Sequence, residues 1–295
     1  MTSIEKLELA REILKKRASI FSRLTFQKLY PFTTENIAGY IDCFDLEDKS
    51  LLTVGSSTDQ VFNAGLKGCR EITVLDLCPF TEDYYYLKKA AQSKLTPEQF
   101  LSFLGYQGNM NEFFYRVLDA IEEEDSFTFW KKLQEEHPYQ LRDRLFIKDE
   151  EQAHIVRKLN PYLLNKANYY ETRERMKVVK PNFVIGNIED EKLGRSFDNI
   201  FLSNVFKREA EESVRKASNN MVAHLNEEGK ILLYYLYDLL GTSADSENYR
   251  FLEPHRRKLR QLPRNISIEL FEGISNLEEN SGMEDGIVVY QKKKH

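Results

Sequence analysis

Short apolar runs alternate with amphipathic stretches around residues 51–79 and again after residue 180. Residues 51–54 (LLTV) form an apolar run that stops at a Gly/Ser turn, an amphipathic stretch continues to Gly68, and residues 72–75 (ITVL) form a second apolar run. Such apolar runs predict buried strands, and the stretch between them predicts the crossover helix of a parallel pair. These residues therefore indicate the first strand, helix and strand of an α/β sheet.

A helical pattern fills residues 80–180, between the second apolar run and the next one. One helix in this region begins after the N-cap Thr96, has Pro97 in its first position and ends at Gly105. A crossover between neighbouring parallel strands needs only about a dozen residues, so this length predicts a large helical insert after the second strand. The insert leaves the carboxyl end of a strand, where open α/β sheets bind ligands, so we expect a lid or an acceptor-binding element. The alternative is a decoration that only stabilises the sheet or an oligomer.

The apolar runs resume after the insert and complete the sheet. A polar loop joins the last two predicted strands, which is the natural form of an antiparallel pair. We therefore expect an α/β fold with a Rossmann-like, seven-stranded, mostly parallel sheet whose last strand is antiparallel. The later strands are predicted at residues 182–186, 197–203, 230–237, 266–271 and 286–291, with a helix over 209–225 and a turn at Gly229 before the fifth strand.

The pattern divides the chain into three parts. We expect residues 1–48 to form an N-terminal helical segment, residues 49–79 and 181–295 a Rossmann-like ligand-binding domain, and residues 80–180 the insert. The first residues, MTSIEKLELAREILKKR, are charged and amphipathic, with Thr2 and Glu5 placed as a capping box. They predict a surface helix rather than a signal peptide.

Charge and cysteine content narrow the class of protein. The formal net charge of −5 argues against a protein that binds nucleic acid mainly by charge. Cys43, Cys69 and Cys78 are too few for a disulfide framework, and their odd number fits a reducing compartment. No apolar run approaches the roughly 18 residues of a membrane span. We therefore expect a cytoplasmic protein without a transmembrane segment.

The histidines do not predict a metal site. They are far apart in the sequence, and no cysteine stands at ligand spacing from any of them. We therefore expect no bound metal. The histidines are His137, His154, His224, His255 and His295.

A carboxylate stands at the end of the second predicted strand. Asp76 follows the Gly/Ser turn by about 20 residues, the spacing at which an acidic residue of a dinucleotide-binding fold reaches the ribose hydroxyls of an adenosine. We therefore expect Asp76 to bind a ribose. The alternative is an ordinary strand, helix and strand unit with a polar turn and a surface aspartate.

The turn after the first strand differs from the fingerprint of NAD-binding folds. Pyrophosphate binding needs a close backbone approach at several glycines, whereas Gly55 is followed by Ser56, Ser57 and Thr58. A ligand with an adenosine but no pyrophosphate fits such a turn better. S-adenosylmethionine has that form and is the expected cofactor.

Longer segments resemble two known groups of proteins. Strand and helix units that end in an antiparallel pair resemble the sheet of class I S-adenosylmethionine-dependent methyltransferases. The segments LLTVGSSTDQVFNAGLKGCREITVLDLCP, YYLKKAAQSKLTPEQFLSFLG, FWKKL, FDNIFLSNVF and GKILLYY are similar to the S-adenosylmethionine:diacylglycerol 3-amino-3-carboxypropyl transferases, which make the head group of betaine lipids. The second resemblance spans residues 51–235 and implies transferase chemistry on a lipid.

With S-adenosylmethionine as the ligand, the first turn and the second strand supply the expected contacts. Gly55 lets the backbone pass close to the methionine moiety, and Ser56, Ser57 and Asp59 are expected to bind the ammonium and carboxylate of that moiety. The acidic Asp59 suits the ammonium or the sulfonium. Leu77 and Cys78 are expected beside the adenine. The expected cofactor-binding residues of this region are Gly55, Ser56, Ser57, Asp59, Asp76 and Leu77.

The ends of the third and fourth strands supply the remaining candidates. Asn187, Ile188 and Asp190 are expected at the adenine ring and its amine, with a strand-to-helix turn capped by the aspartate as the alternative. Ser203 and Asn204 follow the fourth strand and are the candidates for positioning the acceptor. Their alternative is a pair of solvent-facing turn residues.

Residues 29–40 (LYPFTTENIAGY) place aromatic side chains around a polar stretch just before the first strand. In methyltransferase-like proteins helices at this place commonly fold over the cofactor, which makes Tyr30 and Thr34 candidates to line the site. The alternative, which we prefer, is helix capping by Thr33 or Thr34 together with core aromatic residues.

Three functions are compatible with the sequence. Methyl transfer leaves S-adenosylhomocysteine, and 3-amino-3-carboxypropyl transfer leaves methylthioadenosine. A non-catalytic binding protein with this fold is the third. Methyl transfer is favoured because it is the commonest activity of proteins with this fold. The glycine-poor turn favours 3-amino-3-carboxypropyl transfer. The expected partner is a small-molecule or lipid acceptor.

Overall fold

Helices and strands separate into two units along the chain. The structure, a computed structural model, describes residues 1–15, 28–55, 57–105, 110–147, 153–205, 211–236, 266–275 and 284–292. The helical unit comprises Met1–Thr34, Gly55–Phe62 and Asp76–Val178, and the sheet unit comprises Glu35–Val54, Asn63–Leu75 and Val179–His295.

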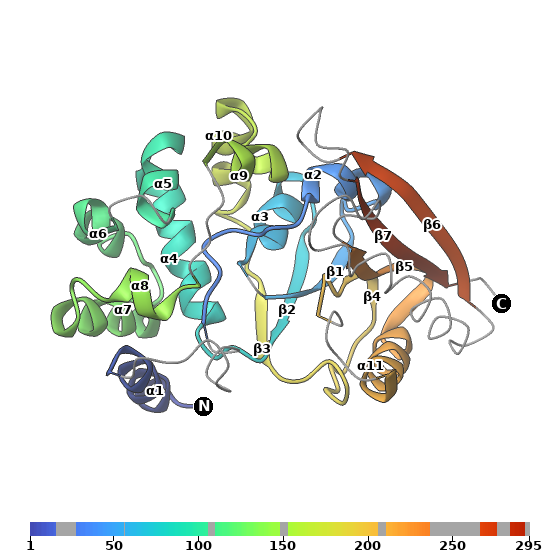
Figure 1. The fold of residues 1–295 in the computed structure, drawn as a ribbon, viewed down its shortest axis with the longest axis horizontal. Coiled ribbons are helices and arrows are strands. Elements are labelled where there is room, and N and C mark those ends of the chain that lie inside the picture. The colour runs from blue at the N-terminus through green and yellow to red at the C-terminus, as the bar shows by residue number, and fades with distance from the viewer. Residues whose placement is uncertain are drawn as a thin grey trace. The chain divides into compact units, whose positions relative to one another are not determined.

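The sheet unit is built on a seven-stranded sheet. Its strands hydrogen-bond in the order β3-β2-β1-β4-β5-β7-β6 (Figure 1). The order changes direction between β1 and β4, and open α/β sheets bind ligands at such a switch point. The strand bounds are Ser50–Val54 for β1, Glu71–Asp76 for β2, Asn182–Ile185 for β3, Phe197–Phe201 for β4, Leu225–Leu236 for β5, Ile266–Ser275 for β6 and Glu284–Lys292 for β7.

Parallel pairing dominates the sheet. Strand β1 is parallel to both β2 and β4, and β4 is parallel to β5. Strand β7 lies between β5 and β6 and is antiparallel to both. The prediction of a mostly parallel sheet with an antiparallel last strand is therefore confirmed. In the register of β1 and β2, Val54 lies opposite Leu75, so the chain leaves both strands at the same edge of the sheet.

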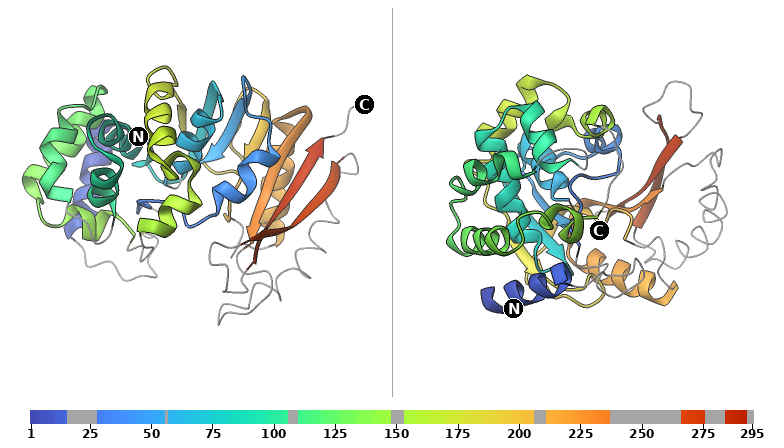
Figure 2. Two further views of the ribbon diagram at one scale, coloured as in Figure 1. Left: turned by 90° about the horizontal axis from the view of Figure 1, so that it is seen from above. Right: turned by 60° about the vertical axis from the view of Figure 1, so that its left-hand side comes forward.

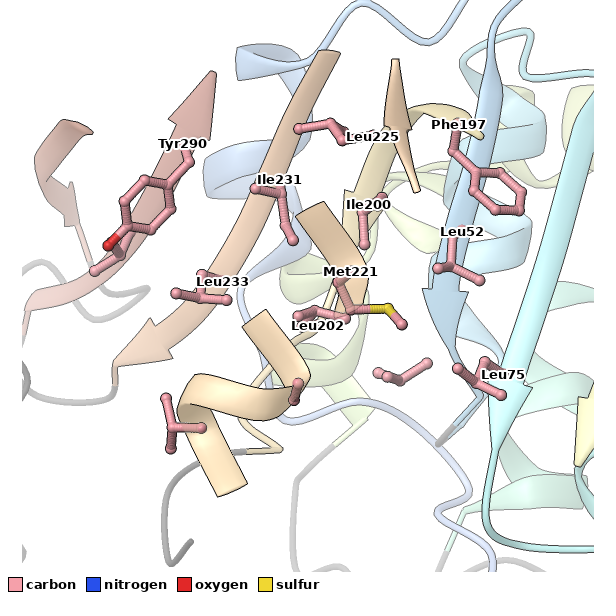
Figure 3. Packing of buried hydrophobic residues seen from close by; sticks show 14 residues of the cluster. Leu52, Leu75, Phe197, Ile200, Leu202, Met221, Leu225, Ile231, Leu233 and Tyr290 are labelled. Carbon is pink, nitrogen blue, oxygen red and sulfur yellow. The ribbon is translucent and has the colours of Figure 1, made fainter. Parts of the chain in front are cut away.

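The central strand β1 is apolar because both of its faces are covered. All five of its residues, SLLTV, are buried, which is typical of a strand inside a parallel sheet. Helix α11 (Glu211–Ala223) contributes Met221 to the apolar cluster that contains Leu52 and Leu202 (Figure 3). Burying each such side chain stabilises the fold by about 1.5–3 kcal/mol. This core fixes the positions at which β1 and β4 end.

The predicted turn at Gly229 is wrong, because Gly229 lies inside β5. The preceding residue, Glu228, adopts a left-handed φ of 62°. A Cβ atom on Gly229 would lie 2.9 Å from the carbonyl oxygens of Asp198 and Asn226. The left-handed residue and the glycine bend the strand without ending it.

Two short helices precede β1 in the sheet unit, α2 (Ile37–Tyr40) and η2 (Ile41–Cys43). The side chain of Asn36 caps α2 by accepting a hydrogen bond from the Gly39 amide at 3.0 Å. Capping by Thr33 or Thr34 is therefore wrong, and the cap lies further along the chain.

Amphipathic helices make up the helical unit, as the pattern of residues 80–180 predicts. Thr96 and Gln99 form a full capping box, Pro97 opens α5 and Gly105 ends it, which confirms the predicted limits of this helix. The bounds are Thr81–Lys94 for α4, Pro97–Leu104 for α5, Met110–Leu118 for α6, Glu124–Glu136 for α7, Leu141–Leu145 for α8, Ala153–Leu159 for α9, Pro161–Leu163 for η3 and Lys166–Arg175 for α10.

Helix α1 (Ser3–Lys15) belongs to the helical unit and lies beside α7 and α8 (Figure 2). The predicted capping box is confirmed, since Glu5 accepts from the Thr2 amide at 2.7 Å and Thr2 accepts from the Glu5 amide at 3.3 Å. On its inner side, Lys6 pairs with the buried Asp83 of α4 at 3.2 Å.

Helix α3 (Asp59–Leu66) begins in the helical unit and ends in the sheet unit. Gly68 follows it with a φ of 84°, so the predicted glycine stop is confirmed. Over the part of the chain that the structure describes, no helix is both long enough and apolar enough to cross a membrane.

Candidate functional site

Gly55 and Asp76, which follow the buried parts of β1 and β2, are in contact. A Cβ atom on Gly55 would lie 2.2 Å from Asp76 Oδ2 and 2.4 Å from Thr81 Cγ2, far inside van der Waals distance. Only glycine therefore lets the Asp76 carboxylate lie at this place. The contact with a methionine moiety that the sequence predicts for Gly55 stays a prediction.

Asp76 is half-buried and holds the turn that leads into α4. Its Oδ1 accepts a hydrogen bond from the Cys78 amide at 2.9 Å, and its Oδ2 accepts from the Thr81 hydroxyl at 2.8 Å. These bonds orient the carboxylate. The contact with a ribose that the sequence predicts for Asp76 stays a prediction.

The two residues after Asp76 differ in their surroundings. The Leu77 side chain is 55% exposed, so an apolar surface is presented next to the carboxylate. Cys78 is buried, and burial raises the pKa of its thiol to about 12. Cys78 is therefore a neutral packing residue rather than a thiolate.

Asp59 is bound by the protein's own donors, which corrects its expected role. Its Oδ1 accepts from Lys88 Nζ at 2.5 Å and from the Tyr162 hydroxyl at 2.7 Å. Its Oδ2 accepts from the Thr33 amide at 2.6 Å and from the Ser57 hydroxyl at 2.8 Å. These four bonds fill the roughly four lone-pair sites of a carboxylate, and Asp59 has no exposed surface. The ammonium that meets Asp59 belongs to Lys88, not to a ligand.

Lys88 lies at the centre of this network and is fully buried in α4. Besides Asp59, its ammonium donates to the Ser57 carbonyl at 2.9 Å and to the Pro31 carbonyl at 3.1 Å. The ammonium also lies 4.7 Å from the centre of the Phe32 ring. All three of its donors are thus used. Burial lowers the pKa of the Lys88 ammonium, and the Asp59 carboxylate opposes that shift.

Sequence reasoning missed Lys88, although the helix pattern carries a signal for it. Residues one turn apart share a face of a helix, and Lys88 lies one turn from the apolar Tyr84 and from Ala91. Both neighbours are buried. A lysine on the apolar face of a helix calls for a buried acidic partner, and Asp59 is that partner.

In the turn between Gly55 and α3, Ser57 and Thr58 are buried, and Thr58 is strained. The Ser57 hydroxyl donates to Asp59 and therefore faces the protein, and Ser56 lies outside the described residues. Thr58 adopts a left-handed φ of 63°, which is a genuine outlier for a β-branched residue. Its Oγ1 is buried and has no hydrogen-bond partner within the described chain. Strain of this kind is concentrated at functional sites.

In the sheet unit, the residues after β3 form a turn. The Asn187 side chain accepts from the Glu189 amide at 3.1 Å, and Ile188 packs partly buried against the apolar core. Asp190 is exposed. The alternative of a strand-to-helix turn capped by Asp190 is wrong, because the next element after β3 is the strand β4 and the accepting side chain is that of Asn187. The adenine contacts of these residues stay a prediction.

Ser203 follows β4 in a strained conformation. Its φ is 59°, and its buried hydroxyl donates to Glu35 Oε1. The other oxygen of Glu35 accepts from the Tyr40 hydroxyl at 3.3 Å. Asn204 is half-buried. The serine hydroxyl is therefore oriented by a buried carboxylate that the sequence does not single out.

A second set of hydrogen bonds joins this region to β5 and β7. The Tyr235 amide donates to the Ser203 carbonyl at 3.0 Å. The Tyr235 hydroxyl accepts from the Asn36 amide at 2.8 Å and donates to the buried Asp285. Glu35, Tyr235 and Asp285 come from segments far apart in the sequence, so no local motif could have revealed them.

The part of the chain that the structure describes contains no group of three or more His, Cys, Asp and Glu residues arranged to hold a metal ion.

Among solved structures, the fold has neighbours of low sequence identity. The glycopeptide N-methyltransferase MtfA is 12% identical, with 90% of this chain and 94% of that chain covered and a TM-score of 0.42. The N-methyltransferase NodS from Bradyrhizobium japonicum WM9, in complex with S-adenosylhomocysteine, is 10% identical, with 98% and 99% covered and a TM-score of 0.41. These neighbours are methyltransferases.

A third neighbour is a TehB-like S-adenosylmethionine-dependent methyltransferase from Corynebacterium glutamicum ATCC 13032. It is 15% identical, with 88% of this chain and 89% of that chain covered and a TM-score of 0.41. No protein-family model and no curated protein matches the sequence. The assignment of residues therefore rests on this chain's own geometry, and the resemblance to the aminocarboxypropyl transferases stays a prediction.

The roles expected of Asp76 and Leu77 toward an adenosine stay predictions. Asp59 is not available to the ammonium of a ligand, because its carboxylate binds the Lys88 ammonium.

Proposed function

We propose that the protein is an S-adenosylmethionine-dependent transferase that binds the adenosine of its cofactor at the end of β2. The observation that carries the proposal is the contact between Gly55 and Asp76. A carboxylate held against a glycine, where two adjacent parallel strands end, is the arrangement by which such sheets hold an adenosine ribose. The strand order changes direction between β1 and β4, next to β2, and this switch point supports the same location for the ligand.

Different residues bind the cofactor and position the acceptor. Asp76 accepts hydrogen bonds from the ribose hydroxyls, and Leu77 covers the adenine. The adenine contacts expected of Asn187, Ile188 and Asp190 are a separate proposal, which substitution of Asn187 would test. When bound, S-adenosylmethionine supplies a carbon made electrophilic by its sulfonium. What the protein must then supply is mainly proximity and orientation of the acceptor.

Ser203 and Asn204 are the residues that we assign to the acceptor. The Ser203 hydroxyl donates a hydrogen bond to Glu35. The oxygen of that hydroxyl can therefore accept a hydrogen bond from another group. An acceptor bearing an N–H or O–H group matches that requirement. A small molecule or a lipid head group can supply such a group.

The glycine-poor turn with Ser57 and Thr58 favours a second candidate, transfer of the 3-amino-3-carboxypropyl group. The two transfers differ in the nucleoside that remains. Methyl transfer leaves S-adenosylhomocysteine, whereas aminocarboxypropyl transfer leaves methylthioadenosine. Chromatography of the nucleosides after turnover decides between them.

The proposed ribose contact is tested by substituting Asp76. Asp76→Ala should weaken S-adenosylhomocysteine binding about tenfold to a hundredfold, because charge-assisted hydrogen bonds contribute about 1.5–3 kcal/mol. Isothermal titration calorimetry measures the change. Thr81→Val is the matched control, since it removes the hydroxyl that orients Asp76 but keeps the carboxylate. Equal losses in the two variants, or no loss in Asp76→Ala, would contradict the ribose contact.

A further inference from the structure

Ser203 is held in an unusual conformation just after β4. Its backbone has a left-handed φ of 59°, which few residues other than glycine adopt. The Tyr235 amide keeps the backbone there by donating to the Ser203 carbonyl at 3.0 Å. A glycine would adopt this conformation with less strain but has no hydroxyl. Strain that persists in this way is concentrated at functional sites, which indicates a role for the hydroxyl.

The partner of the Ser203 hydroxyl is a buried carboxylate that the chain holds in place. The hydroxyl donates to Oε1 of Glu35, of which only 2% is exposed. The Tyr40 hydroxyl donates to the other oxygen of this carboxylate at 3.3 Å. The Glu35 backbone is fixed as well, because its carbonyl accepts from the Ile37 amide at 2.9 Å. The carboxylate is therefore held at hydrogen-bond distance from the serine, as a base must be from the proton that it takes.

A serine bonded to a carboxylate can carry a proton from one group to another. An adjacent base that accepts the serine proton makes the serine oxygen reactive, and that oxygen can take a second proton as it gives its own away. We propose that Glu35 takes up the proton that the acceptor loses, with the Ser203 hydroxyl as the carrier between them. The assignment rests on the proposed function, in which the acceptor binds at Ser203.

Protons and electrons balance in this step. The N–H or O–H proton of the acceptor moves to Ser203 Oγ while the serine proton moves to Glu35 Oε1. The electron pair freed on the acceptor forms the new bond to the electrophilic carbon, and the pair of the broken carbon–sulfur bond stays on sulfur. Glu35 is left as a carboxylic acid, which returns its proton to water. The acceptor must therefore have a proton to lose, so we expect a hydroxyl or an N–H amine rather than a thioether or a fully substituted amine.

A small reagent tests the serine and its base without a known acceptor. Methanesulfonyl fluoride joins its sulfur to a serine oxygen as that oxygen loses its proton, and fluoride leaves. The wild-type protein should gain a methanesulfonyl group at Ser203, which intact mass measures and peptide mapping locates. Glu35→Gln keeps an oxygen that accepts the serine hydrogen bond but is not a base. Labelling of this variant should be about a hundredfold slower, as expected for the loss of a general base.

The pH dependence of labelling separates a base from a structural carboxylate. The wild-type rate should rise as Glu35 ionises and then stay level, because only the carboxylate form accepts a proton. The Glu35→Gln rate should lack this rise. A wild-type rate without it, or a wild-type Ser203 that is not labelled, would overturn the proposal even if the variant fails to fold.

Asp285→Asn is the matched control. Asp285 is a second buried carboxylate of the sheet unit, and it accepts a hydrogen bond from the Tyr235 hydroxyl. Its substitution removes a buried charge but leaves Glu35 in place, so Ser203 should be labelled at the wild-type rate. Equal slowing in Asp285→Asn and Glu35→Gln would show a general loosening of this region and would contradict the role of Glu35.

Calorimetry with S-adenosylhomocysteine separates this proposal from the proposed function. The wild type and Glu35→Gln should bind this nucleoside alike, because Glu35 acts on the acceptor. If both bind it and Ser203 is labelled equally fast in both, the proton transfer is wrong while the proposed function stands. If the wild type does not bind it, the proposed function fails, and the proton transfer fails with it.

Discussion

Lys88 shows how one residue can determine the local geometry of the helical unit. Its ammonium joins the turn before α3, the first residue of α3 and residues 31–33, here called the strap, through three hydrogen bonds. A charge with no exposed surface is stable only when it is paired and its donors are used. The pair therefore fixes one arrangement of these segments, and that arrangement also holds Thr58.

Replacing this lysine tests the network at the residue scale. Lys88→Met keeps a long side chain but leaves the Asp59 charge without its partner, which should lower the free energy of unfolding by about 3–5 kcal/mol. Urea unfolding followed by circular dichroism measures the loss. Lys89→Met is the control in the next position of α4, where the ammonium pairs with the exposed Glu122 at 3.8 Å. Such surface pairs contribute about 0–1 kcal/mol, so similar losses in the two variants would refute the network.

Residue identities at the site were predictable only where local spacing carries the information. Asp76 follows from its distance to the turn, and the structure places it against Gly55. The role of Asp59 could not be predicted, because its donors come from residues as distant as Tyr162. The roles of Glu35 and Asp285 could not be predicted either, because their partners Ser203 and Tyr235 are also distant in the sequence. A buried carboxylate is identified by its partners, and sequence spacing does not reveal those.

Among the elements, the strap is bonded to the residues around the turn before α3. The Pro31 carbonyl accepts from the Tyr84 hydroxyl at 2.5 Å and from Lys88 at 3.1 Å. Phe32 packs edge-to-face on Phe100, with ring centres 5.9 Å apart. The Thr33 amide bonds to Asp59. The strap is therefore held at each of its three residues. It bonds to the buried Asp59, so we expect a ligand to reach this turn slowly.

Loosening the strap should speed ligand binding. Phe32→Ala removes the ring that packs on Phe100 and Lys88 but leaves the turn itself intact, so S-adenosylhomocysteine should associate about tenfold faster in stopped-flow measurements, a change of about 1.4 kcal/mol in the barrier. Amide hydrogen exchange at residues 57–62 should rise in parallel. Phe103→Ala makes a comparable cavity in α5, away from the strap. An equal response of both variants would show that general destabilisation, not the strap, is the cause.

At the scale of the whole molecule, periodicity and length predicted most of the architecture. The strands, the long helical region and the antiparallel last strand follow from apolar runs, spacing and a polar loop. Helix limits were accurate where capping residues mark them, as at Thr96 and Gly105. The prediction failed at Gly229, because a glycine that bends a strand and a glycine that ends one have the same local sequence signal.

The central claim is that this fold holds an adenosine without a pyrophosphate. Thermal melting with two ligands tests it most directly. The account predicts that S-adenosylhomocysteine raises the stability of the wild-type protein by about 2.7 kcal/mol at 100 times its dissociation constant, and that NAD at the same concentration produces no shift. A shift with NAD, or no shift with S-adenosylhomocysteine, would contradict it.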